Sequence, residues 1–353
     1  MLFNYLTTTL RHFRRHVSHS LINLMGLSVA LGACLLIATY VAHEFSFERH
    51  HENRDRIVKV LKEYTAGGGY VERTSEPLGL TAAAQFPEVA SFVSYYSRNR
   101  WIASESGGAY RRLAQANPAI LDVFSFSVIT GNLGSLRADP KTVAITETTA
   151  RLLQILDDPI GQTIRRGDRS FRVGAVIADA PSTTLHLRFD ILSATTAVNS
   201  SHEGRWRIDP GWYSCQNYLY LSKQVNLDAL TGKLNDAIPD WYGEEAVDKF
   251  RLHLQPIEDM RLHGVSQYRG EGPVGTLSNV IALGSVGALI LFIAVINFIN
   301  LSTARANDRV REVGVRKVVG ARRIQLAVQF VGESIVFTWL AGCVALWIAS
   351  RVV

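Results

Sequence analysis

Three long segments without a formal charge constrain the fold of this chain more than any other feature of its sequence. They cover residues 20–42, 272–304 and 334–350, and they contain 23, 33 and 17 residues. A helix needs about 20 predominantly apolar residues to cross a bilayer. The first two segments reach that length, and the third reaches it only together with its flanks. The sequence therefore predicts a helical membrane protein, with residues 44–276 outside the lipid.

The first apolar segment is predicted to be a retained anchor. Its apolar run exceeds the roughly 7–15 residues of a signal-peptide core. Tyr40 also occupies a position where cleavage after Ala42 would require a small side chain. Within this segment, small residues at helical spacing favour close packing of helices in lipid.

The basic residues predict the orientation of the spans. Residues 1–20 carry three arginines and no acid, and residues 305–323 carry seven basic against two acidic residues. Short loops rich in Lys and Arg remain in the cytoplasm. Both basic flanks are therefore expected to be cytoplasmic, and the large middle region is expected to lie on the other side. The sequence pI of about 9.3 reflects this topology; no basic stripe with interleaved aromatics indicates a nucleic-acid surface.

The connection after the second apolar segment has a pattern that charge alone does not explain. Gly314 and Gly320 lie among five valines, and these valines alternate with basic residues. A helix over this segment would have one apolar and one cationic face. Glu312 and Arg316 are four residues apart and can pair on one side of it.

Residues 312–321 read E-V-G-V-R-K-V-V-G-A, which resembles the E-x-G-x-R-x-x-x-G-A signature of MacB/FtsX-type ABC transporter permeases. Residues 297–304, N-F-I-N-L-S-T-A, are similar to the second span of that family. Residues 43–60 resemble the pattern that follows its first span, with Glu48 in place of aspartate and His50 in place of an aromatic residue. In the middle region the sequence predicts a buried strand at 142–146, a short helix at 147–156 and a further helix at 227–238. The strand and helix order of this region also resembles the periplasmic core domain of the family.

The resemblance implies an integral membrane α-helical protein of the bacterial inner membrane, multi-pass and with a cytoplasmic N-terminus. A large α+β periplasmic domain is inserted between the first and second transmembrane helices. The implied parts are a cytoplasmic amphipathic helix (1–20), the first span (21–43), the periplasmic domain (44–276), the second span (277–304), a coupling helix (305–323) and the third span (324–353). The family unit has four spans, so the chain resembles a truncated product or a fragment of a longer permease.

The family mechanism implies partners and not catalysis by this chain. A separate ATPase subunit would bind ATP and Mg²⁺, so no cofactor is expected here, and the chain has no P-loop sequence. Other implied partners are a second permease copy or the missing half, membrane lipid and a periplasmic adaptor, with a peptide, antibiotic or lipoprotein as substrate. The coupling helix would dock on the ATPase through Arg309, Glu312, Gly314, Arg316, Lys317, Gly320 and Ala321.

Polar and small residues within the spans are interpreted as packing positions. Asn297 and Asn300 are expected to make interhelical hydrogen bonds, and Gly284 with Ala288 is expected to form a packing face. Glu333 is placed at the cytoplasmic boundary of the third span.

The middle region has no recognisable catalytic or metal motif. His50 and His51 lack the spacing of a zinc site and are interpreted as surface histidines. Cys215 is predicted to be a small buried residue, and no second cysteine is present in residues 44–276 to form a disulfide with it.

The sequence leaves two alternatives open and argues against a third. An FtsX-like subunit could signal to periplasmic partners without moving a substrate. A membrane-anchored sensor with an outer ligand domain would instead have a signalling segment after Ala304, where the sequence has a third apolar segment. A membrane-anchored hydrolase would need a nucleophile or metal cluster that residues 44–276 do not display.

Overall fold

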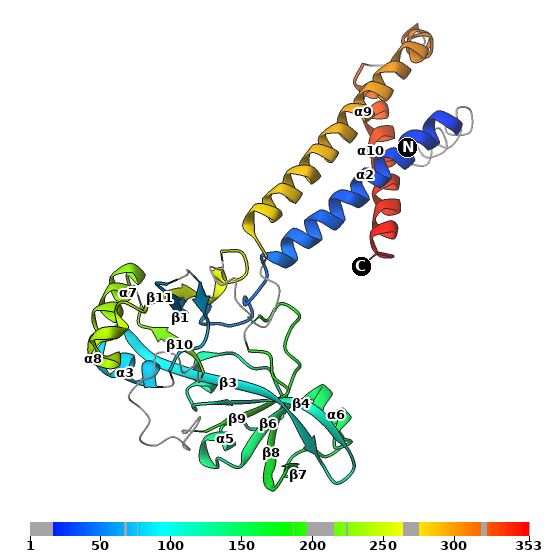
Figure 1. Ribbon diagram of the computed structural model, residues 1–353. Helices are drawn as coiled ribbons and strands as arrows, with labels where there is room; N and C mark the ends of the chain where they lie inside the picture. The colour runs from blue at the N-terminus through cyan, green and yellow to red at the C-terminus, as the bar shows by residue number, and fades with distance from the viewer. Residues whose placement is uncertain are drawn as a thin grey trace. The chain divides into compact units, whose positions relative to one another are not determined.

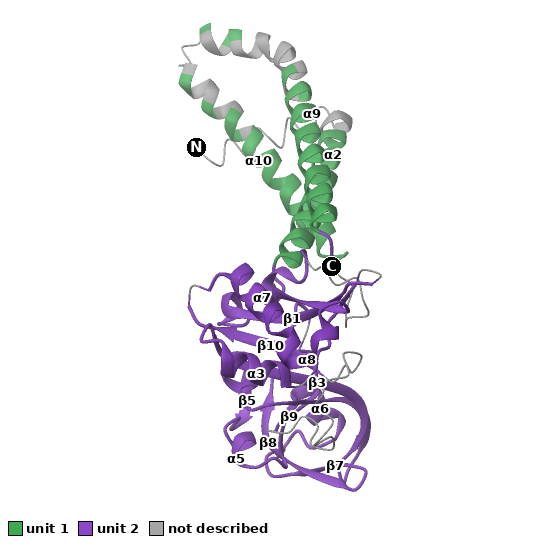
Figure 2. Cartoon of the chain, turned by 60° about the vertical axis from the view of Figure 1, so that its left-hand side comes forward, with its two compact units in different colours: residues 1–45, 277–353 green, residues 46–276 purple. Residues whose placement is uncertain are grey.

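The structure is a computed structural model that describes residues 17–66, 69–75, 77–185, 187–195, 215–223, 225–263, 275–318 and 323–352. The predicted N-terminal amphipathic helix therefore falls almost wholly outside the described residues. The chain divides into two compact units, Met1–Phe45 with Leu277–Val353 and Ser46–Thr276 (Figure 2).

Three long helices form the first unit: α2 (Val17–Glu44), α9 (Leu277–Val318) and α10 (Arg323–Ala349). Two of their segments are long and apolar enough to cross a membrane, Leu21–Glu44 with a mean hydropathy of 2.3 and Leu277–Leu301 with 2.5. The apolar part of α10, Ser334–Ala349, is shorter. Two candidate membrane helices thus flank the second unit in sequence, and the third predicted span stays a prediction.

Helix α2 packs against both other helices of the first unit. A Cβ atom on Gly287 of α9 would lie 3.1 Å from the Ile37 side chain, and one on Gly32 would lie 3.6 Å from the backbone of Ala345 in α10. The Cys34 thiol donates a hydrogen bond to the Gly287 carbonyl at 3.3 Å. The close approach of α2 and α9 at Gly287 therefore depends on the missing side chain, whereas Gly32 would leave room for an ordinary contact with α10.

The second unit is built on one 11-stranded mixed sheet (Figure 1). Its main path runs β11-β1-β10-β3-β4-β9-β6-β8-β5, while β2 pairs with β1 and β7 pairs with both β3 and β8. The strands are β1 (Ile57–Tyr64), β2 (Tyr70–Val71), β3 (Val89–Ala103), β4 (Gly108–Ala116), β5 (Val128–Gly131), β6 (Thr142–Thr146), β7 (Thr163–Arg166), β8 (Arg169–Ile177), β9 (Ile191–Ala194), β10 (Gln216–Leu221) and β11 (Phe250–Pro256).

Short helices cover different parts of this sheet. In Figure 1, α3, α7 and α8 lie beside β1 and β10, while α5 and α6 lie near β6 and β8. The helices are α3 (Pro77–Gln85), α4 (Ile120–Val123), α5 (Ser135–Ala138), α6 (Glu147–Leu152), α7 (Leu227–Asp236) and α8 (Ile238–Tyr242), with 3₁₀ turns η1 (Arg54–Arg56), η3 (Glu244–Ala246) and η4 (Ile257–Asp259).

Local sequence signals explain where these helices begin and end. Helix α6 starts where the Thr146 side chain accepts the Thr149 N–H. Its predicted end at residue 156 is wrong by four residues, because Gln154 adopts a left-handed conformation (φ 57°) and Ile155 N–H bonds back to Ala150. The helix predicted over 227–238 likewise ends at Asp236, and a new helix with proline in its first turn follows.

The core of the second unit comes from strands that are apolar on both faces. All five residues of β6 are buried, as the sequence predicts for a buried strand at 142–146. Leu230 and Leu234, one turn apart on α7, pack with Val60 and Phe250 in the cluster beneath α3, α7 and α8. Cys215 is 1% exposed, which confirms the prediction of a buried cysteine. The second unit is therefore a mixed α+β domain that has its own cores.

We expect Gly131→Ala to destabilise the second unit by about 3 kcal/mol, because it combines overpacking with backbone strain. Gly131 has φ 86°, and an added Cβ would meet the Gly174 carbonyl and lie 2.7 Å from Ile160. Gly161 has the same φ, but an added Cβ there meets nothing within 4 Å. Gly161→Ala should therefore cost only about 1 kcal/mol. Denaturant unfolding of both variants measures the difference, and equal losses would contradict the packing argument.

Candidate functional site

The basic connection predicted between the second and third spans continues helix α9. This helix runs from Leu277 to Val318 without a break among the described residues. Its first part is the apolar candidate span Leu277–Leu301, and its last part carries the basic sequence. Four predicted docking residues, Arg309, Glu312, Gly314 and Arg316, lie on this last part with Lys317, while Gly320 and Ala321 fall outside the described residues.

The predicted packing residues of the second span face away from the rest of the described chain. Ala288, Asn297 and Asn300 are exposed, and a Cβ on Gly284 would meet nothing within 4 Å. The close helix approach occurs instead at Gly287, three residues after Gly284. The interhelical hydrogen bonds expected of Asn297 and Asn300 thus stay predictions. A partner for them would have to come from outside the described residues. Glu333 lies on α10, in its first half.

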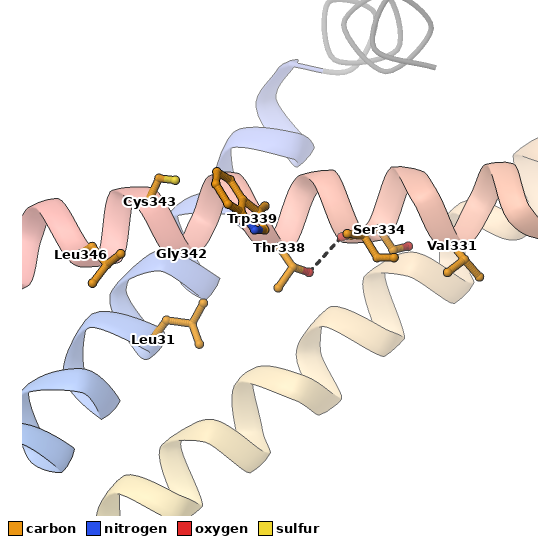
Figure 3. Close-up of a pocket in the computed structure, with 9 residues that line it drawn as sticks. Leu31, Val331, Ser334, Thr338, Trp339, Gly342, Cys343 and Leu346 are labelled. Atoms are coloured by element: carbon orange, nitrogen blue, oxygen red, sulfur yellow. Dashed lines mark hydrogen bonds between the residues drawn. The ribbon is translucent and has the colours of Figure 1, made fainter. Parts of the chain in front are cut away.

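A groove of about 810 Å³ lies along α10 and reaches α2 (Figure 3). Its lining is mainly apolar, and Trp339 is 74% exposed beside it. The Thr338 hydroxyl donates to the Ser334 carbonyl at 2.9 Å, so this polar group is satisfied within its own helix. The complete lining is Leu31, Val331, Ser334, Ile335, Thr338, Trp339, Gly342, Cys343 and Leu346. An apolar groove of this kind suits lipid or another helix.

The interpretation of the two adjacent histidines as surface residues was wrong for His51. His51 is 2% exposed and His50 is half-buried. Neither residue is on a helix, and the centroids of the two imidazole rings are 3.9 Å apart. Glu48 is 2% exposed and adopts φ 57°, a left-handed conformation that is uncommon for a residue with a side chain.

Glu48 and His51 tie this turn to two distant segments of the same unit. Glu48 Oε1 accepts the Leu185 N–H at 2.6 Å, and the Glu48 N–H donates to the Thr183 carbonyl at 3.1 Å. His51 Nδ1 accepts the Ser125 N–H at 3.2 Å, and its Nε2 lies 3.3 Å from Glu48 Oε2. The turn that directly follows α2 in the chain is therefore anchored in the sheet domain. We call Glu48, His51 and the backbone groups that they contact the juxtamembrane anchor.

The juxtamembrane anchor does not fit a metal ion, although ligand atoms of Glu48, His50 and His51 lie within 4.8 Å of one another. Because His51 Nδ1 accepts a backbone N–H, the proton of the neutral ring resides on Nε2. A metal bound at Nε2 would need the lone pair of that nitrogen, so the ring proton would have to move to Nδ1. The Nδ1–H group would then point at the Ser125 N–H, and two donors would face each other. The sequence signal that could have revealed the anchor is the Glu-x-x-His spacing of residues 48–51.

We expect the second unit to lose stability as the pH falls below about 6.5, the ordinary pKa of histidine. Burial lowers the pKa of His50, and nearby His51 lowers it further, while Glu48 partly opposes both. Between the lowered pKa of His50 in the folded chain and its pKa of about 6.5 in the unfolded chain, the unfolded chain binds more protons than the folded one. The contribution of neutral His50 to folding stability is therefore fully present above pH 6.5 and declines as the pH falls below that value. Thermal unfolding of the full chain between pH 7.5 and 5 measures the decline.

His50→Phe should flatten this acid-side decline, because an aromatic ring keeps the packing and removes the titrating group. His263→Phe, at an exposed ring in the same unit, is the control and should leave the decline in place. A steeper decline in His50→Phe would contradict the assignment.

Comparison with known families decides what kind of protein carries these features. The MacB-like periplasmic core domain matches residues 20–237, more than half of the chain. The FtsX-like permease C-terminal domain matches residues 284–352, which include α9 from Gly284 onward and all of α10. The chain belongs to the MacB/FtsX-type permease family. Its second unit is therefore a MacB-like periplasmic domain, and the first unit contributes the FtsX-like part.

Individual relatives agree with this assignment. The macrolide export ATP-binding/permease protein MacB of Hyphomonas neptunium is 24% identical over 208 residues, 59% of this chain and 30% of the relative. The protein of the same name from Sodalis glossinidius is 22% identical over 285 residues, 80% of this chain and 38% of the relative. The chain thus spans about a third of the length of the curated relatives that it matches.

A solved structure supports the fold of the periplasmic domain. A domain of a permease protein from Porphyromonas gingivalis aligns with a TM-score of 0.50 and 20% identity, covering 66% of this chain and 99% of that chain. At this identity the likeness shows the fold alone.

Proposed function

We propose that this permease transmits ATP-driven motion from a separate ABC ATPase to its own periplasmic domain. The observation that carries the proposal is the continuity of α9, in which the apolar span and the basic segment form one helix. A helix of 42 residues is about 60 Å long, longer than a bilayer is thick. A push on its basic end would therefore act directly on the chain that enters the periplasmic domain.

The arrangement of charge supports a cytoplasmic position for the basic end of α9. Seven basic residues in 305–323 would stay on the cytoplasmic side, which puts the N-terminus there and residues 44–276 in the periplasm of the inner membrane. In this proposal α10 is a third span, and its apolar groove accepts lipid, a second permease copy or a further helix of the transporter. ATP and Mg²⁺ belong to the partner ATPase, and this chain needs no cofactor.

The proposed outcome is expulsion or transfer of a substrate in the periplasm, with a peptide, an antibiotic or a lipoprotein as the classes under consideration. A periplasmic adaptor is a further proposed partner. The relatives that match are named for macrolide export, which makes a macrolide the first antibiotic to test.

We expect the charge-reversing double variant Gly314→Glu/Arg316→Glu to lose capture of the ATPase by at least about tenfold. Both changes place acidic side chains on the proposed docking face, and repulsion or desolvation at an interface costs several kcal/mol. Co-purification of the detergent-solubilised protein with its candidate ATPase measures the loss. Arg351→Glu, a charge reversal after the end of α10, is the control that should keep full capture. Equal capture by the double variant and the wild type would rule out docking through this segment.

A further inference from the structure

Two neighbouring hairpins of the periplasmic domain place arginines directly opposite one another. In the β3–β4 pair Arg100 faces Arg111, and in the β7–β8 pair Arg166 faces Arg169. The hairpins are joined at Ala103, which pairs with Arg165. Like charges directly opposite on adjacent strands destabilise a sheet. Two such pairs on joined hairpins repel each other's charge, and the fold gives no reason for this repulsion. An anion bound between the arginines would offset it.

Three of these four arginines lie close enough for their charges to act on one another, and the fourth, Arg111, is the cross-strand neighbour of Arg100. Burial lowers the pKa of Arg166, and the positive charges of Arg169 and Arg100 lower it further. Arg100 therefore lies near the β7–β8 pair, on the face of β3 that also bears Tyr96. Two more guanidinium groups extend the cluster over the Tyr96 ring, at 5.0 Å and 5.9 Å from its centroid. The arginine face comprises Arg73, Arg98, Arg100, Arg111, Arg166 and Arg169.

In the part of the chain that the structure describes, carboxylates do not balance this charge. Among the described residues, Asp190 is the one acid within ion-pair distance of the arginine face, 3.7 Å from Arg111. The Arg111 Nε atom is buried and has no hydrogen-bond partner. The chain between the two cytoplasmic basic flanks carries a slight excess of acidic residues, so the positive cluster is a local feature and not part of a generally basic domain.

We propose that the arginine face binds a ligand through its phosphate groups. A guanidinium group offers a planar fork of donors that matches a phosphate bidentately. A phosphate monoester adds close to two negative charges and three acceptor oxygens, which suits two opposed arginine pairs better than a single carboxylate does. The phosphate could be carried by a soluble compound or by a lipid headgroup, and the test distinguishes these sources. This site is independent of the proposed coupling to an ATPase.

The test uses the full chain in nanodiscs of phosphatidylcholine at constant ionic strength. Calorimetry measures binding of inorganic pyrophosphate, and vesicle co-flotation compares phosphatidic acid with phosphatidylcholine. The test variant is Arg100→Gln/Arg166→Gln. The control is Arg151→Gln/Arg165→Gln, which removes the same charge at two exposed arginines outside the arginine face, one on α6 and one next to Arg166 on β7.

We expect the test variant to lose at least about tenfold in affinity for the phosphate probe, while the control stays within about twofold of the wild type. Without any probe, the test variant should unfold at the same temperature as the wild type or higher, because arginine repulsion is relieved. Binding of pyrophosphate indicates a soluble ligand, and binding only to phosphatidic acid indicates a lipid. Absence of binding to both probes, or equal loss in test and control variants, would overturn the proposal.

Discussion

Thr303→Pro is expected to abolish coupling between the permease and its ATPase while leaving the two proteins bound to each other. Thr303 lies at the end of the apolar part of α9, just before the basic part, and its hydroxyl bonds to the Ile299 carbonyl at 2.8 Å. Proline there removes the backbone N–H that bonds to the same carbonyl and clashes with it, at a cost of about 3 kcal/mol or more in a helix interior. The helix would bend or break between its docking end and its span.

The measurement for Thr303→Pro is permease-stimulated ATP hydrolysis in nanodiscs, together with co-purification of the ATPase. We expect stimulation to fall by at least about tenfold, with capture within about twofold of the wild type. Thr303→Val removes only the hydroxyl and keeps the backbone bond, so it should couple almost normally. If Thr303→Pro stimulates hydrolysis as well as the wild type does, then transmission along α9 is wrong even if docking through residues 305–318 is right.

The second large effect is expected at the juxtamembrane anchor. Glu48→Ala should destabilise the periplasmic domain by about 3 kcal/mol, because it leaves the buried Leu185 N–H without its acceptor and removes the carboxylate that lies 3.3 Å from the buried His51 Nε2. The left-handed backbone at residue 48 remains strained in the variant, since alanine also has a Cβ. For a domain of this size the loss corresponds to a fall in melting temperature of roughly 10 °C.

Glu52→Ala is the matched control for the juxtamembrane anchor. Glu52 lies four residues later in the same segment, and its side chain is exposed. Its backbone N–H donates a hydrogen bond to Ser125 Oγ at 3.0 Å, which the change to alanine leaves in place. This change should alter stability by less than about 0.5 kcal/mol. Thermal and denaturant unfolding of both variants decide the point, and losses of equal size would show that the Glu48 carboxylate is not a structural anchor.

The anchor also bears on the proposed transmission of motion. Glu48 is four residues after the end of α2 in sequence, so the anchor holds the chain to the sheet domain soon after this candidate membrane helix. In Glu48→Ala we expect weaker coupling at temperatures where the periplasmic domain is still folded.

Much of this protein could be predicted from local sequence alone. Uncharged length indicates candidate spans, because a bilayer core excludes charge over a fixed thickness. Local patterns also predict the buried strand at Thr142–Thr146 and the buried Cys215, since both depend on nearby apolar residues. The family follows from the glycines and charged residues of 312–321, whose spacing is specific.

Contacts between residues far apart in sequence were decided by the tertiary structure. His51 is buried because Ser125 and Glu48 surround its nitrogens, and no helical or zinc-site spacing reports such partners. Helix approach at Gly32 and Gly287 depends on how three helices cross, which small-residue spacing alone does not specify. The arginine face likewise exists only because the register of two hairpins sets Arg100 against Arg111 and Arg166 against Arg169. The sequence by itself thus determined two candidate spans and the family, because bilayer thickness and motif spacing act locally along the chain. Only the folded sheet and helix packing determined which side chains share a surface, because strand register and helix crossing are set by the whole domain.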